Sequence, residues 1–195
     1  MKKLMIAAAI VCAAALSQAA TVDWSVTAGK TSKLYGANGT SYMGKTAGDA
    51  FYLILDSGTY VADITAALKA GTFTGTEAGI LDAVKNTDGT SISTTYGGLT
   101  QKPSTNSALL KGDGETLYDF VALIVSNDAD GKANWKFSTT IENQLASTDD
   151  SKNTLPWTSS NFDSTWSKPD AIPEPTSAML LLLGVAGLAL RRRRA

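Results

Sequence analysis

The sequence contains no histidine, and its single cysteine, Cys12, lies in an apolar segment close to the N-terminus. Residues 20–172, called the body below, therefore have neither an imidazole nor a thiol. This excludes thiolate or imidazole metal sites, Ser-His-Asp and Cys-His nucleophiles and a disulfide from the body. The body must be held together by packing, and 153 residues are enough to bury one hydrophobic core.

Arginine is also missing from the body, because all arginines of the chain lie at residues 191–194. The body has 11 lysines and 17 acidic residues, a formal charge of −6, so the net charge of −1 for the whole chain combines an acidic body with basic ends. Phosphate backbones are neutralised by clustered Lys and Arg, which this body lacks. We therefore expect no nucleic-acid partner, and no pattern in the body indicates a cofactor.

The N-terminal residues are typical of a secretory signal peptide. Lys2 and Lys3 form a basic start, Leu4–Leu16 is apolar, and small residues stand at 17 and 19. This pattern predicts a signal helix over residues 1–19, recognition by the export translocon, and cleavage between Ala19 and Ala20. The apolar run is shorter than the roughly 20 residues that a membrane-spanning helix needs.

The C-terminal residues combine three features in a fixed order: Pro173-Glu174-Pro175, an apolar segment at 176–190, and Arg191, Arg192, Arg193 and Arg194. The two prolines hold the backbone extended around the acid, which suits recognition as a strand-like substrate. The apolar segment predicts a short transmembrane helix, and the arginines would keep its end cytoplasmic.

This tail resembles the PEP-CTERM sorting signal, which is recognised by exosortase in Gram-negative-type envelopes. The resemblance covers residues 173–195 and implies processing near Pro173–Pro175 by an exosortase-type protease. It also implies an inner-membrane intermediate, followed by placement at the cell-envelope surface or outside the cell. Proteins with this tail are often matrix or surface proteins associated with extracellular polysaccharide, but their bodies are mutually dissimilar. An alternative is a tail-anchored periplasmic domain whose tail stays uncut.

The body has the pattern of a small, mainly β fold. Alternating or continuous apolar runs bounded by turn residues predict strands, and residues 127–131 predict a hairpin connection. The predicted strands are Thr21–Ala28, Ala50–Leu55, Ile92–Thr95, Ala108–Leu110, Leu117–Val125 and Asn134–Thr140. Helical spacing predicts two short helices, one through Val61, Ile64 and Leu68 ending at Gly71, the other through Ile80, Leu81 and Val84.

These elements predict an antiparallel β-sandwich or jelly-roll over residues 20–146, flanked by the signal helix and the C-terminal hydrophobic helix. Residues 147–172 are polar and contain prolines and isolated aromatics, which indicates an irregular segment draped on the body and then a linker. Ser and Thr make up about a quarter of the body, which fits either a β surface or O-glycosylation.

Candidate chemistry in the body is sparse. Asp128 and Asp130 have a partial calcium-loop spacing, although a turn is the favoured interpretation. A carboxylate-only hydrolase could pair Asp119 with Asp149 or Asp150. Sugar rings could stack on exposed aromatics, which makes a carbohydrate-binding module another alternative. The aromatics in question are Trp24, Trp135, Trp157 and Trp166. We expect a non-enzymatic protein with a structural, adhesive or biofilm-associated role.

Overall fold

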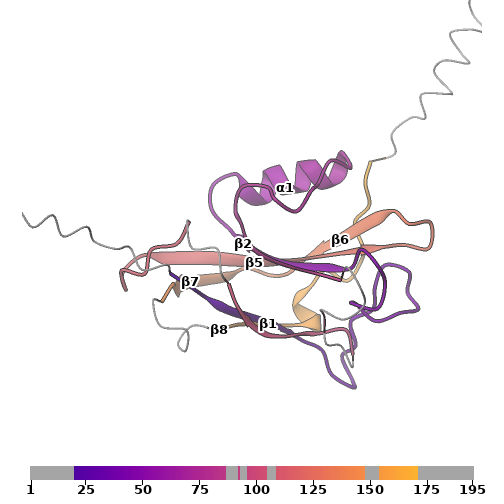
Figure 1. Cartoon of the computed structure of the whole chain (residues 1–195), viewed down its shortest axis with the longest axis horizontal. Helices are drawn as coiled ribbons and strands as arrows, with labels where there is room; N and C mark the ends of the chain where they lie inside the picture. The colour runs from indigo at the N-terminus through magenta and orange to yellow at the C-terminus, as the bar shows by residue number, and fades with distance from the viewer. Residues whose placement is uncertain (1–19, 87–91, 93–95, 105–108, 148–153, 171–195) are drawn as a thin grey trace, which may run out of the picture.

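The computed structural model of the chain describes residues 20–86, 92, 96–104, 109–147 and 154–170 (Figure 1). The predicted signal segment and sorting tail lie outside these ranges. The elements run in the order β1 (Asp23–Thr27), β2 (Ala50–Leu55), α1 (Tyr60–Lys69), β3 (Ile80–Lys85), β4 (Leu99–Pro103), β5 (Leu117–Asn127), β6 (Ala133–Phe137), β7 (Ile141–Leu145), β8 (Thr154–Thr158) and a 3₁₀ turn (Ser159–Asn161).

The fold is mainly β, as predicted, with two sheets and one short α-helix. The larger sheet has the order β3-β2-β5-β6, and β7 pairs with the first half of β5. The smaller sheet has the order β4-β1-β8. Figure 1 shows α1 on the outer face of the larger sheet and the smaller sheet on its other side. The expectation of wholly antiparallel pairing is wrong at one place, because β1 and β8 run parallel.

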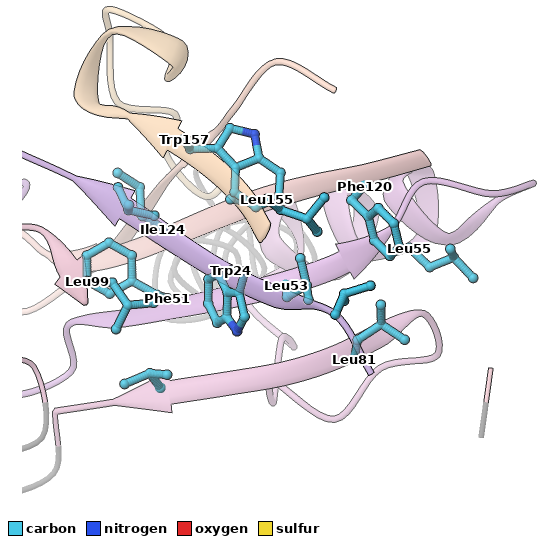
Figure 2. Close-up of a cluster of buried hydrophobic side chains, with 14 of the residues drawn as sticks. Trp24, Phe51, Leu53, Leu55, Leu81, Leu99, Phe120, Ile124, Leu155 and Trp157 are labelled. Carbon is cyan, nitrogen blue, oxygen red and sulfur yellow. The ribbon is translucent and has the colours of Figure 1, made fainter. Parts of the chain in front are cut away.

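The larger hydrophobic core lies between the two sheets (Figure 2). Strand β1 supplies it by simple alternation, since Trp24 and Val26 are fully buried while Thr27 is exposed. The opposing side chains come mainly from β2, β5 and β8. They include Phe51, Leu53, Leu55, Phe120, Ile124, Leu155 and Trp157. The strands predicted around Trp24, at residues 50–55 and at residues 117–125 are all confirmed.

A second core lies between α1 and the outer face of the larger sheet. Ile64 and Leu68 of α1 are buried there, against alternate residues of β2 and β5 such as Ile54 and Leu123. Both faces of β2 and β5 are thus covered, which explains why these strands have nearly continuous apolar sequences.

The predicted helix at residues 61–68 is confirmed as α1, and its end follows from local chemistry. Gly71 has φ +68°, a conformation that costs glycine little. The Gly71 N–H donates to the Leu68 carbonyl at 3.1 Å and the Thr72 N–H to the Ala67 carbonyl at 2.9 Å. These two bonds satisfy carbonyls that the helix leaves free at its C-terminus.

The prediction of a second helix at Ile80, Leu81 and Val84 is wrong, because these residues form the edge strand β3. Leu53 pairs with Asp82 and Ile54 with Ile80, so Leu81 is an extra residue in a β-bulge. A bulge shifts the alternation of side chains by one residue. Leu81 and Val84 therefore enter the same core, a spacing that imitates one turn of helix.

The interpretation of residues 147–172 as irregular is also wrong for β8. Leu155 and Trp157 are buried and alternate with exposed neighbours. Pro156 hid this strand in the sequence, but β8 is an edge strand, where a residue without an N–H is tolerated. Further on, residues 162–170 run beside β6 and α1, with Trp135 pairing with Ser167 and the Asp170 N–H donating to the Lys69 carbonyl at 2.9 Å.

The remaining predictions divide between confirmed and missed elements. The strand predicted from Asn134 is confirmed as β6, and the predicted hairpin connects it to β5. Strands β4 and β7 were not predicted, since their sequences, LTQKP and IENQL, are largely polar. Leu109 and Leu110 form no strand, and residues 93–95 and 108 lie outside the described residues.

Candidate functional site

Asp128 and Asp130, the weak candidates for a cation site, are part of the β5–β6 turn, which confirms the favoured interpretation. The Asp128 carboxylate accepts from the backbone N–H groups of Asp130 at 3.0 Å and of Lys132 at 2.9 Å. These bonds, led by the one from Lys132, lower the pKa of Asp128. The carboxylate therefore stabilises the turn. In the described part of the chain, no group of three or more His, Cys, Asp or Glu residues could hold a metal ion.

Of the carboxylates in the hydrolase alternative, Asp119 lies within the described residues, and its role there is structural. Its side chain accepts from the Asn143 N–H at 2.7 Å, and Asn143 has the unusual φ of +57°. The carboxylate thus supports a strained position in the middle of β7, the strand that pairs with β5. Asp149 and Asp150 lie outside the described residues.

The tryptophans do not form the platform for sugars that the carbohydrate-binding alternative requires. Trp24 and Trp157 are fully buried between the sheets, and Trp135 is 2% exposed beneath α1. Trp166 is half-buried, and the Lys136 ammonium lies 5.1 Å from its ring centroid. Three of the four rings are therefore core residues, and their burial excludes a shared flat surface.

Tyrosines form the exposed aromatic group that the tryptophans do not. The rings of Tyr35 and Tyr42 have centroids 5.0 Å apart, and Tyr42 meets Tyr96 edge-on at 6.4 Å. Tyr35 is 40% exposed, and the other two rings are partly exposed. We call Lys33, Tyr35, Tyr42 and Tyr96 the tyrosine surface.

The backbone fixes these rings in place. Tyr35 and Tyr42 form a β-bridge, so their neighbours Leu34 and Met43 turn inward, where both are buried. The Leu34 N–H donates to the Tyr96 carbonyl at 2.9 Å, and the Met43 N–H donates to the Leu34 carbonyl at 3.0 Å. Three tyrosines from two distant segments are thus tied to one short ladder.

A lysine completes the tyrosine surface. The Lys33 Nζ lies 5.8 Å from the Tyr42 ring centroid, within the range of a cation–π contact. The pKa of Lys33 is raised, most strongly by hydrogen bonding to Tyr42 and next by the electrostatic effect of Tyr35. The pKa of Tyr42 is lowered, most strongly by its hydrogen bond with Lys33 and next by its hydrogen bond with Tyr35. The ammonium of Lys33 is exposed and stays charged at physiological pH.

The connection that bears most of the surface, residues 28–49, is long, and a buried carboxylate holds it to the larger sheet. Asp49 is fully buried and accepts from the Gly44 N–H at 2.7 Å, the Thr46 N–H at 3.0 Å and the Ser126 hydroxyl at 2.7 Å. Ser126, on β5, in turn accepts from the Ala37 N–H at 2.9 Å. Loops of this length without regular structure are uncommon in compact domains and are often functional.

The charge of this connection differs from that of the body. Residues 28–48 contain Lys30, Lys33 and Lys45 and no acidic residue, although the body as a whole has a charge of −6. All three lysines are exposed. The sequence analysis missed this site because Tyr96 is far from Tyr35 in the chain. The signal that could have found it is the acid-free, lysine- and tyrosine-bearing stretch between two strands.

The predicted sorting residues, Pro173, Glu174, Pro175 and Arg191–Arg194, lie outside the described residues, as does Ala19. Residues 171–194 match the family model of the PEP-CTERM protein-sorting motif. The chain thus carries the sorting signal that its tail resembles. This motif implies export, sorting to the cell envelope and an exosortase as the processing partner. No curated protein and no solved structure matches the chain.

The predicted cleavage point at the other end adjoins the described body. Ala20 is 1% exposed, and Thr21 exchanges backbone hydrogen bonds with Ser147. No helix within the described ranges is long and apolar enough to cross a membrane, and the predicted span at 176–190 lies outside them.

Proposed function

We propose that this protein is a non-enzymatic component of the cell surface or extracellular matrix, with a structural or adhesive role, delivered by an exosortase-type system. The match of residues 171–194 to the PEP-CTERM motif is the observation that carries the proposal. The body fits such a role because it lacks histidine, cysteine and arginine, the residues on which many catalytic sites rely.

The carboxylates considered as alternative sites support the same proposal. Asp128 accepts hydrogen bonds from the backbone of its own turn, and Asp119, on β5, accepts one from the backbone of the neighbouring strand β7. A carboxylate occupied in this way positions a loop, whereas a general acid or base must face a substrate. The packed cores on both sides of the larger sheet suit a protein that must persist outside the cell without disulfides.

Intact mass measured on the protein from its native host, after separation of inner membrane, outer envelope and medium, tests the delivery. We expect loss of residues 1–19 and of the tail after a cut near Pro173–Pro175, with the product in the envelope or medium. Added mass beyond the bare chain would indicate glycosylation. A chain intact through Arg194 in the inner membrane would contradict the proposal and favour a tethered periplasmic domain.

A matched pair of variants sharpens this test. Glu174→Ala removes the acid between the two prolines, and we expect it to leave the tail uncut and the protein in the membrane fraction. Glu115→Ala removes an exposed acid in a loop of the body and should be processed like the unchanged protein. Equal processing of the two variants would show that the motif does not direct the cut.

A further inference from the structure

We propose that the tyrosine surface binds an acidic polysaccharide whose repeating sugars carry uronate carboxylates. The inference rests on the proposed surface or matrix role and names a ligand class and a site for it. It depends on three observations in the body: the exposed tyrosine rings, the lysines beside them and the buried network beneath them.

The rings supply contact area. The exposed parts of Tyr35, Tyr42 and Tyr96 offer apolar ring faces and hydroxyl groups side by side. A sugar ring has an apolar face of C–H groups and a polar rim, so it matches side chains that combine an aromatic body with a polar tip. The rings are tilted by 40° and 73° to their neighbours, which suits successive sugars of a bent chain better than one flat ligand.

The lysines supply the charge preference. Lys33 adjoins the rings, and Lys30 and Lys45 lie on the same acid-free connection. A carboxylate that approaches the rings meets the exposed ammonium of Lys33, and Lys30 and Lys45 add two exposed positive charges to the same connection. The rest of the body carries excess negative charge and repels polyanions. A polyanion is therefore guided to this surface and kept away from others.

The buried network supplies rigidity. Asp49 and Ser126 fix the connection to β5 through four hydrogen bonds of 2.7–3.0 Å, and the Leu34 and Met43 ladder fixes the rings. A surface that is already ordered loses little conformational entropy on binding, which raises the affinity available from few contacts.

Nucleic acid is the other polyanion that could stack on aromatic rings. It is disfavoured because its closely spaced phosphates require denser cation clusters than three lysines, and the body offers no arginine. Single-stranded DNA is therefore a comparison ligand in the test.

The test measures dissociation constants by isothermal titration calorimetry, using the protein and its variants purified from the native host. The probe is polygalacturonate, compared with dextran and an oligo-dT of similar length. We expect binding to polygalacturonate that weakens as salt is raised, with dextran and oligo-dT at least about tenfold weaker. No binding to polygalacturonate, or equal binding to oligo-dT, would overturn the proposal.

Variants locate the site. Lys33→Gln should weaken binding about two- to fivefold, the effect of one exposed charge contact, and Lys33→Arg should preserve it. Tyr35→Ala should weaken binding about three- to tenfold, while Tyr35→Phe keeps the ring and most of the affinity.

The matched control is Lys85→Gln, because Lys85 also lies over a tyrosine, with its Nζ 5.9 Å from the Tyr52 centroid. We expect it to bind as the unchanged protein does, and near-UV circular dichroism should show that every variant is folded. Binding that Lys33→Gln and Tyr35→Ala leave unchanged would remove the ligand from this surface. That outcome would leave the sorting proposal standing, because sorting is read from mass and fractionation alone.

Discussion

Replacing Trp157 by alanine tests whether β8 packs against the larger sheet. Trp157 is fully buried between the two sheets, and its indole Nε1–H donates to the Thr139 carbonyl at 3.0 Å. Removing a buried tryptophan costs about 3–5 kcal/mol through lost transfer energy and a residual cavity. The hydrogen bond adds little, because the Thr139 carbonyl keeps a second donor, the Ser138 hydroxyl, at 2.9 Å.

Trp166→Ala is the matched control, since it removes the same side chain from the same stretch of sequence. Trp166 is half-buried and its ring lies under Lys136, so its loss should cost about 1 kcal/mol. A domain of this size has about 5–15 kcal/mol of stability, so only the Trp157 variant should come close to unfolding.

Urea unfolding followed by far-UV circular dichroism measures both variants without relying on tryptophan emission. With a slope of about 2 kcal/mol per M, Trp157→Ala should lower the midpoint by about 1.5–2.5 M and Trp166→Ala by about 0.5 M. Equal shifts for the two variants would refute the reasoning. They would indicate that residues 154–158 only drape over the body.

Three further perturbations test the loops, with unfolding as the readout for the first two. Gly97→Ala should cost more than about 2 kcal/mol, because Gly97 has φ +90° and a Cβ there would lie 2.0 Å from the Leu34 carbonyl oxygen. The control Gly39→Ala should cost about 1 kcal/mol, because Gly39 has φ +70° but its Cβ would lie in open space. Asp49→Ala should cost about 2–4 kcal/mol, since it leaves the N–H groups of Gly44 and Thr46 without the carboxylate that accepts from them. Hydrogen bonds led by the Thr116 hydroxyl lower the pKa of Asp113 to about 2, so its stabilising effect is complete above its ordinary pKa near 3.8 and is lost as the pH falls toward 2. An NMR titration should place the Asp113 midpoint near 2, and a midpoint near 3.8 would contradict its hydrogen bonds.

The elements that the sequence predicts correctly are those whose pattern has one physical cause. Strands β2 and β5 are covered on both faces, which produces unbroken apolar runs, and α1 is apolar on the one side that packs. Strand β1 faces a core on one side only and alternates accordingly. In each case, burial alone determines which positions are apolar, so the apolar pattern of the sequence predicts the element.

The elements that the sequence does not predict depend on strand pairing as well as on burial. The bulge at Leu81 changes the phase of β3, and the edge position of β8 makes Pro156 acceptable. Strands β4 and β7 owe their place to pairing with β1 and β5, since their own residues are mostly polar. These strands form because they pair with strands distant in the chain, and such pairing cannot be predicted from a local sequence pattern.

The candidate site shows the same division. The tail is a contiguous motif and can be identified from sequence alone, as the match over residues 171–194 shows. The tyrosine surface joins Tyr96 to Tyr35 and Tyr42, which lie more than fifty residues earlier, and the contact depends on the bond from the Leu34 N–H to the Tyr96 carbonyl. Its charge, however, was visible in advance, because an acid-free stretch bearing three lysines stands out in an acidic body.

Asp49 explains why this surface and the core cannot be considered separately. A fully buried carboxylate is destabilising unless hydrogen bonds replace its water, and here three donors do so. Two of the donors belong to the connection itself and the third to β5, so the charge is satisfied only when the connection lies in its folded position. The cost of leaving Asp49 unsatisfied therefore keeps the long connection, and with it the tyrosines and Lys33, in one arrangement. In a body without cysteine or histidine, a buried polar network of this kind gives an exposed loop the rigidity that a binding surface requires.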